Sequence, residues 1–120
     1  MEYANHLYRS ADGRLDLYAR IYGGDGPTLL MMHGLTRNGS DFEALIAALG
    51  PNYRCIAVDQ RGRGRSAYDP EPENYNPAVY AADMIGLLDD LGIEKAALIG
   101  TSMGGLIAMT MATVAPHRVG

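Results

Sequence analysis

The sequence contains little cysteine, little positive charge and no long apolar run, and each scarcity removes a class of protein. Its one cysteine, Cys55, excludes an internal disulfide and a metal site built from several cysteines. No apolar run approaches the roughly 20 residues that span a bilayer. The first 30 residues carry too many charges for the apolar core of a signal peptide. The 10 basic residues form no block and are outnumbered by 14 acidic ones, which disfavours binding to nucleic acid or a membrane surface. We therefore expect a cytoplasmic protein with no nucleic-acid, membrane or metal partner.

What is present indicates a folded domain. Hydrophobic residues make up 48% and charged residues 20% of the 120 positions, as in a soluble globular protein. Near the N-terminus, Asp12-Gly13 is a signal for a two-residue turn. The flanking segments His6–Ser10 and Arg14–Tyr22 are therefore predicted to form a β-hairpin.

The rest of the chain alternates between two patterns. Continuous apolar runs predict strands buried on both faces at Thr28–Met32, Tyr53–Val58 and Ala96–Ile99. Apolar residues at helical spacing predict helices at residues 40–49, from Pro77 to a cap at Gly92, and from Gly105 to about Ala115. Strands that alternate with helices imply a parallel sheet. The predicted fold class is α/β: a predominantly parallel sheet with helices on both faces and an N-terminal β-hairpin.

The strongest chemical motif is Gly100-Thr101-Ser102-Met103-Gly104, which matches G-x-S-x-G and stands between a predicted strand and a predicted helix. A serine on such a tight turn needs small neighbours two residues away on each side, which Gly100 and Gly104 provide. The start of the following helix would add free N–H groups and partial positive charge. We therefore predict that Ser102 is a nucleophile and that the Met103 N–H donates to an oxyanion.

A second motif, His33-Gly34-Leu35, directly follows the first apolar run. The second oxyanion donor of a nucleophile elbow comes from the loop after that strand. Gly34 is predicted to let the backbone bend, so that the Leu35 N–H faces the substrate carbonyl. His33 is interpreted as a structural residue that fixes this loop by hydrogen bonding, because it precedes the serine in the chain.

A third motif, Asp59-Gln60-Arg61-Gly62-Arg63-Gly64-Arg65-Ser66, follows the second apolar run. We interpret it as architecture, with arginines paired to Asp59 or to neighbouring acids. The three motifs stand in the order and at the spacing of the α/β-hydrolase fold superfamily, and the sequence resembles the N-terminal half of its serine-nucleophile branch. Pro116-His117-Arg118-Val119 also resembles the stretch that leads into the next strand of that family.

The resemblance implies acyl transfer at an ester or related carbonyl of a small molecule. A serine at the elbow also argues against the members of the family that use aspartate there for halides or epoxides. The resemblance further implies a triad in which an acid and then a histidine follow the serine. No Asp or Glu follows Ser102, and His117 is predicted to lie at the wrong end of the sheet to reach it. Residues 1–120 are thus expected to form one partial domain that lacks the later strands, the cap, the acid and the histidine.

Two hypotheses remain open. The first is a serine hydrolase with a backbone oxyanion hole. The second is a catalytically inactive fragment or a binding protein, with Ala96–Ile99 as an exposed strand edge for self-association. No cofactor is expected under either, because Gly62-Arg63-Gly64 lacks the third glycine of a dinucleotide motif and no P-loop sequence occurs.

Overall fold

The predicted apolar runs form three neighbouring parallel strands at one side of the sheet. The structure is a computed structural model, and it describes residues 2–120. One sheet has the strand order β1-β2-β4-β3-β5, in which β3 pairs in parallel with β4 and β5. The antiparallel pairs are β1 with β2 and β2 with β4. The strands are β1 (Ala4–Arg9), β2 (Asp16–Tyr22), β3 (Thr28–Met32), β4 (Arg54–Asp59) and β5 (Ala97–Gly100).

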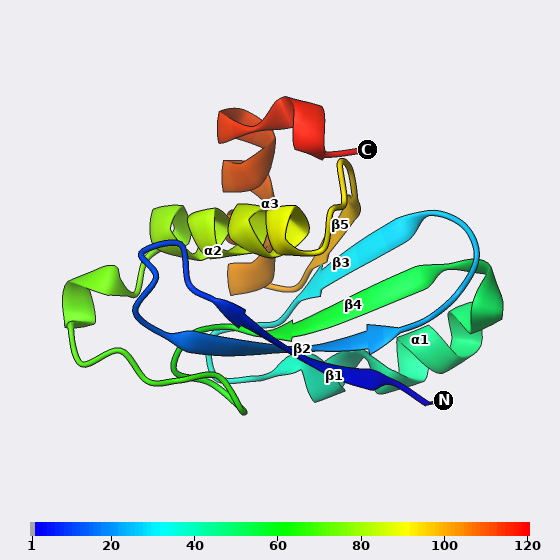
Figure 1. The fold of residues 1–120 in the computed structure, drawn as a ribbon, viewed down its shortest axis with the longest axis horizontal. Helices are drawn as coiled ribbons and strands as arrows, with labels where there is room; N and C mark the ends of the chain where they lie inside the picture. The colour runs from blue at the N-terminus through cyan, green and yellow to red at the C-terminus, as the bar shows by residue number, and fades with distance from the viewer. Residues whose placement is uncertain (1) are drawn as a thin grey trace.

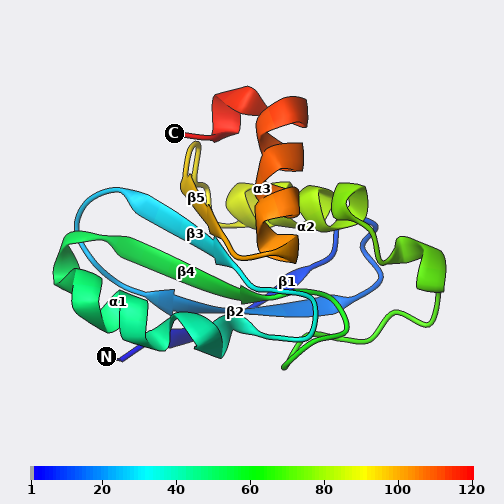
Figure 2. The same cartoon turned by 180° about the vertical axis from the view of Figure 1, so that it is seen from behind.

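Helices cover both faces of this sheet, as predicted (Figures 1 and 2). A short 3-10 turn (Gly39–Phe42) leads into α1 (Glu43–Leu49) on one face. On the other face lie α2 (Pro77–Asp90) and α3 (Met103–Val114). Three further 3-10 turns span Gly50–Asn52, Pro72–Asn74 and Pro116–Arg118.

The alternation of side chains along the central strands gives each face its own core. Leu30 and Met32 of β3 pack with α2 and α3, whereas Leu29 and Met31 pack toward α1. Cys55 lies in the α1 core and is 1% exposed, so burial raises the pKa of its thiol. Its environment is that of a small core residue, as predicted.

The hairpin differs from its prediction in its turn. The pairing of β1 and β2 stops at Arg9 and Asp16, so the connection is longer than two residues. The Ser10 N–H donates to the Leu15 carbonyl at 2.9 Å, and the Ser10 hydroxyl accepts a hydrogen bond from the Leu15 N–H at 3.0 Å. Gly13, at φ 75°, lies inside this wider loop. The expectation of a two-residue Asp-Gly turn is therefore wrong, because the Ser10 side chain closes a larger loop.

The signals at the two ends of α2 act as predicted. The Asn76 side chain accepts the Val79 N–H at 3.0 Å, and Pro77 occupies the first helical position. At the other end Gly92 has φ 67°, and the Ile93 N–H returns to the Leu88 carbonyl at 2.8 Å. The two caps fix where α2 begins and ends. Its beginning is important for function, because the first turn lies beside the site described below.

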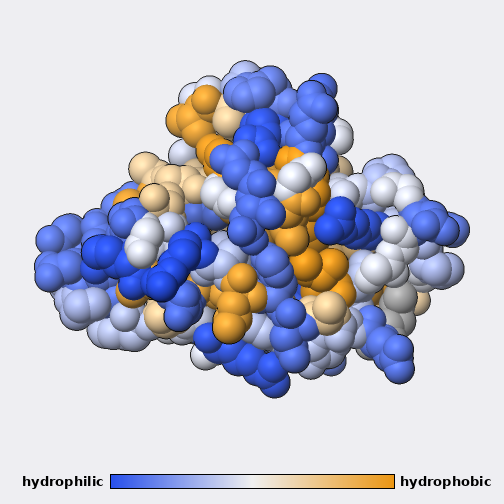
Figure 3. All heavy atoms as spheres, viewed as in Figure 1, coloured by the Kyte–Doolittle hydropathy of each residue, from blue (hydrophilic) through white to orange (hydrophobic). Residues whose placement is uncertain are grey.

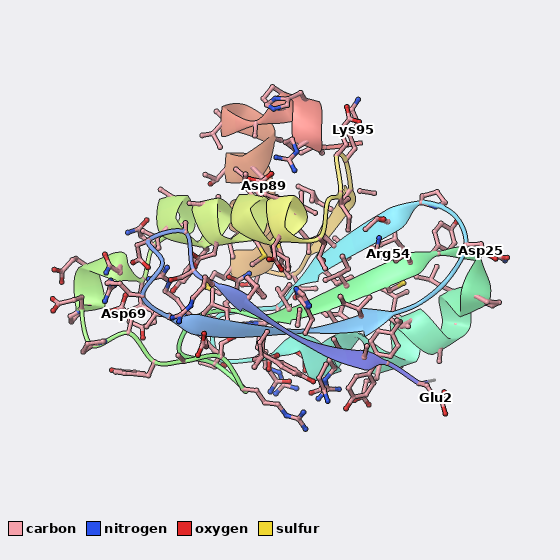
Figure 4. All side chains as sticks on the ribbon, viewed as in Figure 1. Glu2, Asp25, Arg54, Asp69, Asp89 and Lys95 are labelled. Carbon is pink, nitrogen blue, oxygen red and sulfur yellow. The ribbon has the colours of Figure 1, made fainter. Side chains whose placement is uncertain are left out.

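The parallel strands run toward one end of the molecule. In Figure 4, Asp25, Arg54 and Lys95 mark the end where β3, β4 and β5 begin, and Asp69 lies toward the opposite end. At its start β5 gains a neighbour, because Ala96 forms an isolated parallel bridge with Val119. Within residues 2–120, β3 is the only strand that pairs with the rest of β5. The predicted self-association would have to use that outer edge.

Apolar side chains also reach the surface. Leu106, Met109 and Val114 of α3 are 55%, 67% and 62% exposed. Figure 3 shows apolar atoms over the upper part of α3 and beside α2. No helix in the described part of the chain is long and apolar enough to cross a membrane.

A buried ionic cluster holds the loop after β4. Arg61 is fully buried, and its guanidinium contacts Asp69 and Asp83, each at 2.8 Å. Asp83 also accepts the Ala11 N–H from the hairpin loop at 2.9 Å. The cluster therefore ties the loop after β4 to α2 and to the N-terminal hairpin.

Asp59, in contrast, is not an arginine partner. It accepts the backbone N–H groups of Gly39 and Arg65 at 2.7 and 2.9 Å. The prediction that arginines of this loop pair with acids is thus confirmed for Arg61. Its partners are Asp69 and Asp83 and not Asp59.

The cluster predicts a large cost for removing one of its carboxylates. Asp83→Asn should lower the free energy of unfolding by about 3 kcal/mol, because it leaves a fully buried guanidinium short of a charged partner. Asp89→Asn, on the same helix, is the matched control. Asp89 is 62% exposed in its pair with Arg118, so its loss should cost less than about 1 kcal/mol. Urea unfolding of both variants measures the difference, and equal costs would contradict the role of the buried cluster.

The same cluster predicts a pH dependence on the acid side. The Glu71 N–H, the Asn74 amide and the Arg14 guanidinium lower the pKa of Asp69 from 3.8 to about 2. Ionised Asp69 therefore stabilises the fold fully above about pH 4, and this contribution disappears as the pH falls toward 2. Unfolding free energies measured across this range should fall less steeply in Asp69→Asn than in the wild type. Part of the slope should remain, because the Ser10 hydroxyl in particular lowers the pKa of Asp12 to about 2.

Candidate functional site

Ser102 occupies the sharp connection between β5 and α3. It has φ 54° and ψ −112°, and it is the one non-glycine residue with positive φ among residues 2–120. This backbone region costs a residue with a side chain about 1–3 kcal/mol. The side chain is exposed at the N-terminus of α3. The fold thus holds a serine in a strained conformation and presents it to solvent.

Two glycines make this connection sterically feasible. A Cβ at Gly100 would come within 3.0 Å of the Gly104 backbone, and a Cβ at Gly104 would come equally close to the Met32 carbonyl. The Thr101 N–H also donates to that carbonyl at 3.1 Å. The start of α3 therefore rests directly on the end of β3, without a side chain between them.

The loop after β3 passes beside Ser102. A Cβ at Gly34 would lie 3.8 Å from the Ser102 Cβ and 3.7 Å from the Thr101 carbonyl oxygen, both ordinary contacts. Gly34 is also absent from the residues with positive φ. The close approach therefore puts this loop at the site. The prediction that Gly34 is needed for a bend of the backbone finds no support, because neither its φ nor its surroundings require a glycine.

His33 is fully buried beneath this loop. Its Nε2 accepts the Gln60 N–H at 2.9 Å, which places the ring proton on Nδ1, and Nδ1–H donates to the Gly34 carbonyl at 2.7 Å. Burial lowers the pKa of the ring. Both ring nitrogens are thus occupied, and His33 has no free lone pair with which to accept a proton.

A cavity of about 340 Å³ brings the predicted reactive residues together. Its lining includes Ser102 with Leu35 and Met103, the two residues whose N–H groups are predicted oxyanion donors. In the described chain neither N–H has a hydrogen-bond partner. For Met103 this follows from its place in the first turn of a helix, where N–H groups lack intrahelical acceptors. The cavity is thus lined by an exposed serine and by two residues whose backbone N–H groups are unpaired.

Sequence reasoning did not identify the remaining walls of the cavity. They are formed by Tyr75, Asn76, Pro77, Tyr80 and Leu106. All but Leu106 come from the start of α2 and the residues before it. In an alternating α/β chain each helix starts near the carboxyl ends of the strands, so the Asn76-Pro77 start signal could have placed this segment at the site.

Neither of the other two histidines reaches the cavity. His117 follows α3, whose 12 residues extend about 18 Å from the end that carries Ser102. His6 lies on β1 and contacts Asp90 at 2.7 Å. The described residues also contain no group of three or more His, Cys, Asp or Glu that could hold a metal ion.

Comparison with known proteins identifies the fold. Residues 27–120 match the family model described as the alpha/beta hydrolase fold. The chain belongs to the α/β-hydrolase fold family. A crystal structure of an α/β hydrolase from Novosphingobium aromaticivorans superposes with a TM-score of 0.91 at 42% identity, covering 98% of this chain and 42% of that chain.

Three curated members of the α/β-hydrolase family illustrate the range of its activities. The 3-hydroxybutyrate-oligomer hydrolase of Cupriavidus necator is 44% identical over 70% of this chain and 29% of its own length. The 2-(acetamidomethylene)succinate hydrolase of Mesorhizobium japonicum is 39% identical over 89% of this chain and 37% of its own length. Epoxide hydrolase B of Mycobacterium tuberculosis is 35% identical over 78% of this chain and 26% of its own length. The chain thus spans less than two fifths of each of these relatives.

The contact between α3 and β3 predicts which glycines resist substitution. Gly104→Ala should destabilise the protein by about 1–3 kcal/mol, because the added methyl group overlaps the Met32 carbonyl. Gly86→Ala is the control, since a Cβ at this position in α2 meets nothing within 4 Å. There alanine should stabilise the helix by up to about 1 kcal/mol. Thermal unfolding distinguishes the two, and a Gly104→Ala variant as stable as the wild type would contradict the steric account.

Proposed function

We propose that the protein is a serine hydrolase that cleaves an ester or a related carbonyl bond of a small molecule. Ser102 Oγ attacks the carbonyl carbon and forms an acyl-enzyme, and water then releases the acid. The observation that carries this proposal is the cavity lined by the strained, exposed Ser102 and by Leu35 and Met103, whose N–H groups are unpaired.

The electrostatics of the cavity favour negative charge on the substrate oxygen. Ser102 caps α3, and the free N–H groups of the first helical turn carry partial positive charge. Hydrogen-bond donors that are already aimed at a developing oxyanion typically contribute a factor of about 10²–10³ each to the rate. Met103 supplies such a donor from the helix itself.

The second donor is held by its own peptide unit. The Gly34 carbonyl accepts hydrogen bonds from His33 Nδ1 at 2.7 Å and from the Arg37 N–H at 3.1 Å. In a planar trans peptide the N–H of the next residue points the opposite way from this carbonyl. Fixing the Gly34 carbonyl therefore fixes the direction of the Leu35 N–H, which gives His33 a structural role in our proposal.

The names of the relatives support hydrolysis, and the serine at the elbow favours one kind of hydrolysis over another. One relative is named an oligomer hydrolase and another an epoxide hydrolase. The family resemblance assigns aspartate to the elbow of members that act on epoxides, whereas this chain has serine there. We therefore favour acyl transfer at a carbonyl over epoxide opening.

Inactivity, or binding without catalysis, is the competing function. It is motivated by the cavity lining, which includes no histidine and no carboxylate among the described residues. In the proposed hydrolase, the proton of Ser102 passes to a histidine that this part of the chain does not supply. The two functions differ in whether Ser102 is activated.

Covalent labelling of the full-length product of the encoding gene tests this difference. A fluorophosphonate probe should add its phosphonyl group to the peptide that contains Ser102, as read by mass spectrometry. Ser102→Ala should remove the label, because the attacking hydroxyl is gone. Ser40→Ala, which changes a serine bonded to Asn38 outside the cavity, should leave it intact. An unlabelled wild type, or a label that survives in Ser102→Ala, would show that Ser102 is not the nucleophile.

A further inference from the structure

One side chain outside the cavity lining, Arg63, contacts both residues that carry the proposed oxyanion donors. We propose that Arg63 is a positioning residue, which holds Leu35 and Met103 in register by means of its planar guanidinium. This inference rests on the proposed function, because it concerns the oxyanion hole of the same site. It adds a residue to which the interpretation of the Asp59–Ser66 motif gave only an architectural role.

Each nitrogen of the guanidinium contacts a different neighbour. Nε donates to the Leu35 carbonyl at 3.0 Å. Nη1 donates to the Arg61 carbonyl at 3.0 Å and to the Tyr80 hydroxyl at 2.8 Å. Nη2 lies 3.8 Å from the Met103 sulfur. One side chain therefore joins the loop after β3, the loop after β4, the start of α2 and the start of α3.

Arg63 is not explained by ion pairing. It is half-buried, yet within the described chain no carboxylate lies within 4.0 Å of its guanidinium. Arg61, two residues earlier, has two such partners. The cation of Arg63 lies instead over the rings of Tyr75 and Tyr80, at 5.6 and 5.3 Å from their centroids. The two rings thus hold the charged, planar guanidinium of Arg63 in place, and its N–H groups donate to neutral acceptors.

The Arg63 guanidinium contacts both residues that carry the proposed oxyanion donors in a way that restricts their movement. Leu35 lines the cavity and its carbonyl accepts a hydrogen bond from Arg63 Nε, so anchoring the carbonyl restricts rotation of the residue as a whole. Met103 presents its N–H at the start of α3 and its thioether to the same guanidinium. A displacement of about 1 Å in such donors can lower a rate by about 10²-fold. Without Arg63 the two donors would lose their common support.

Replacement by lysine separates positioning from charge. Lysine keeps the positive charge and most of the aliphatic stem, but it presents one ammonium group in place of a planar fork. It therefore cannot span the acceptors on Leu35, Arg61 and Tyr80 together. If Arg63 acts only through its charge, lysine should restore function, and if it acts by position, lysine should not.

The experiment compares R63M, R63K and R65M in the full-length gene product. Two readouts are the rate of Ser102 labelling by a fluorophosphonate and the kcat and KM for p-nitrophenyl acetate. R63M and R63K should both lower the labelling rate and kcat about tenfold or more, with a smaller change in KM, because the two donors act mainly on the oxyanion of the transition state. R65M is the matched control, since the Arg65 side chain bonds Tyr18 and Asn5. It should match the wild type.

Each result has a definite meaning. A wild-type rate in R63M, or full recovery in R63K, would overturn the positioning role while leaving the proposed hydrolase intact. A wild type that the probe never labels would instead overturn the proposed function, and this inference with it. Thermal unfolding of every variant shows whether it is folded, and R63K carries the test if R63M is not.

Discussion

The close contact between the start of α3 and the end of β3 is the constraint on which the site depends. A side chain at Gly104 would collide with the Met32 carbonyl and one at Gly100 with the helix backbone, so no side chain separates the two elements. Between these two contacts the chain passes from strand to helix through the strained conformation of Ser102. That conformation is stabilised by the packing around it, and it leaves Ser102 exposed at the cavity that Leu35 and Met103 also line.

The other walls of the site are connected to the stability of the fold. Arg61 is fixed by its buried pairs with Asp69 and Asp83, and its carbonyl in turn accepts a hydrogen bond from Arg63. The ionic cluster therefore anchors the loop that supports the proposed oxyanion hole. A buried pair of this kind contributes modestly to net stability but makes the loop conformation specific. We infer that the cluster stabilises the site through the backbone of this loop.

Local sequence signals predicted the parts of the fold that local physics determines. The apolar run Thr28–Met32 coincides with β3, and the signals at Asn76-Pro77 and Gly92 coincide with the ends of α2. The Gly-x-Ser-x-Gly motif predicted the sharp turn because its glycines are required by a contact within a few residues and one neighbouring strand. The helices on both faces followed from the alternation of elements.

The features that were missed depend on contacts between distant residues. The closure of the hairpin loop by Ser10 and the pairing of Arg61 with Asp83 involve hydrogen bonds that no local pattern specifies. Of the two tyrosines of the cavity, Tyr75 ends a long loop whose path depends on tertiary packing, and Tyr80 lies at the start of the helix that follows. The support of the Leu35 loop by Arg63 joins residues 28 positions apart. Spacing along the sequence carries no information about such pairs, which the folded chain alone brings together.

The most direct measurement of the central claim is a crystal structure of the full-length protein with a phosphonate bound covalently to Ser102. We expect the phosphoryl oxygen to lie about 2.7–3.1 Å from the backbone nitrogens of both Leu35 and Met103. An adduct on Ser102 whose phosphoryl oxygen points to solvent, or bonds to neither nitrogen, would contradict it.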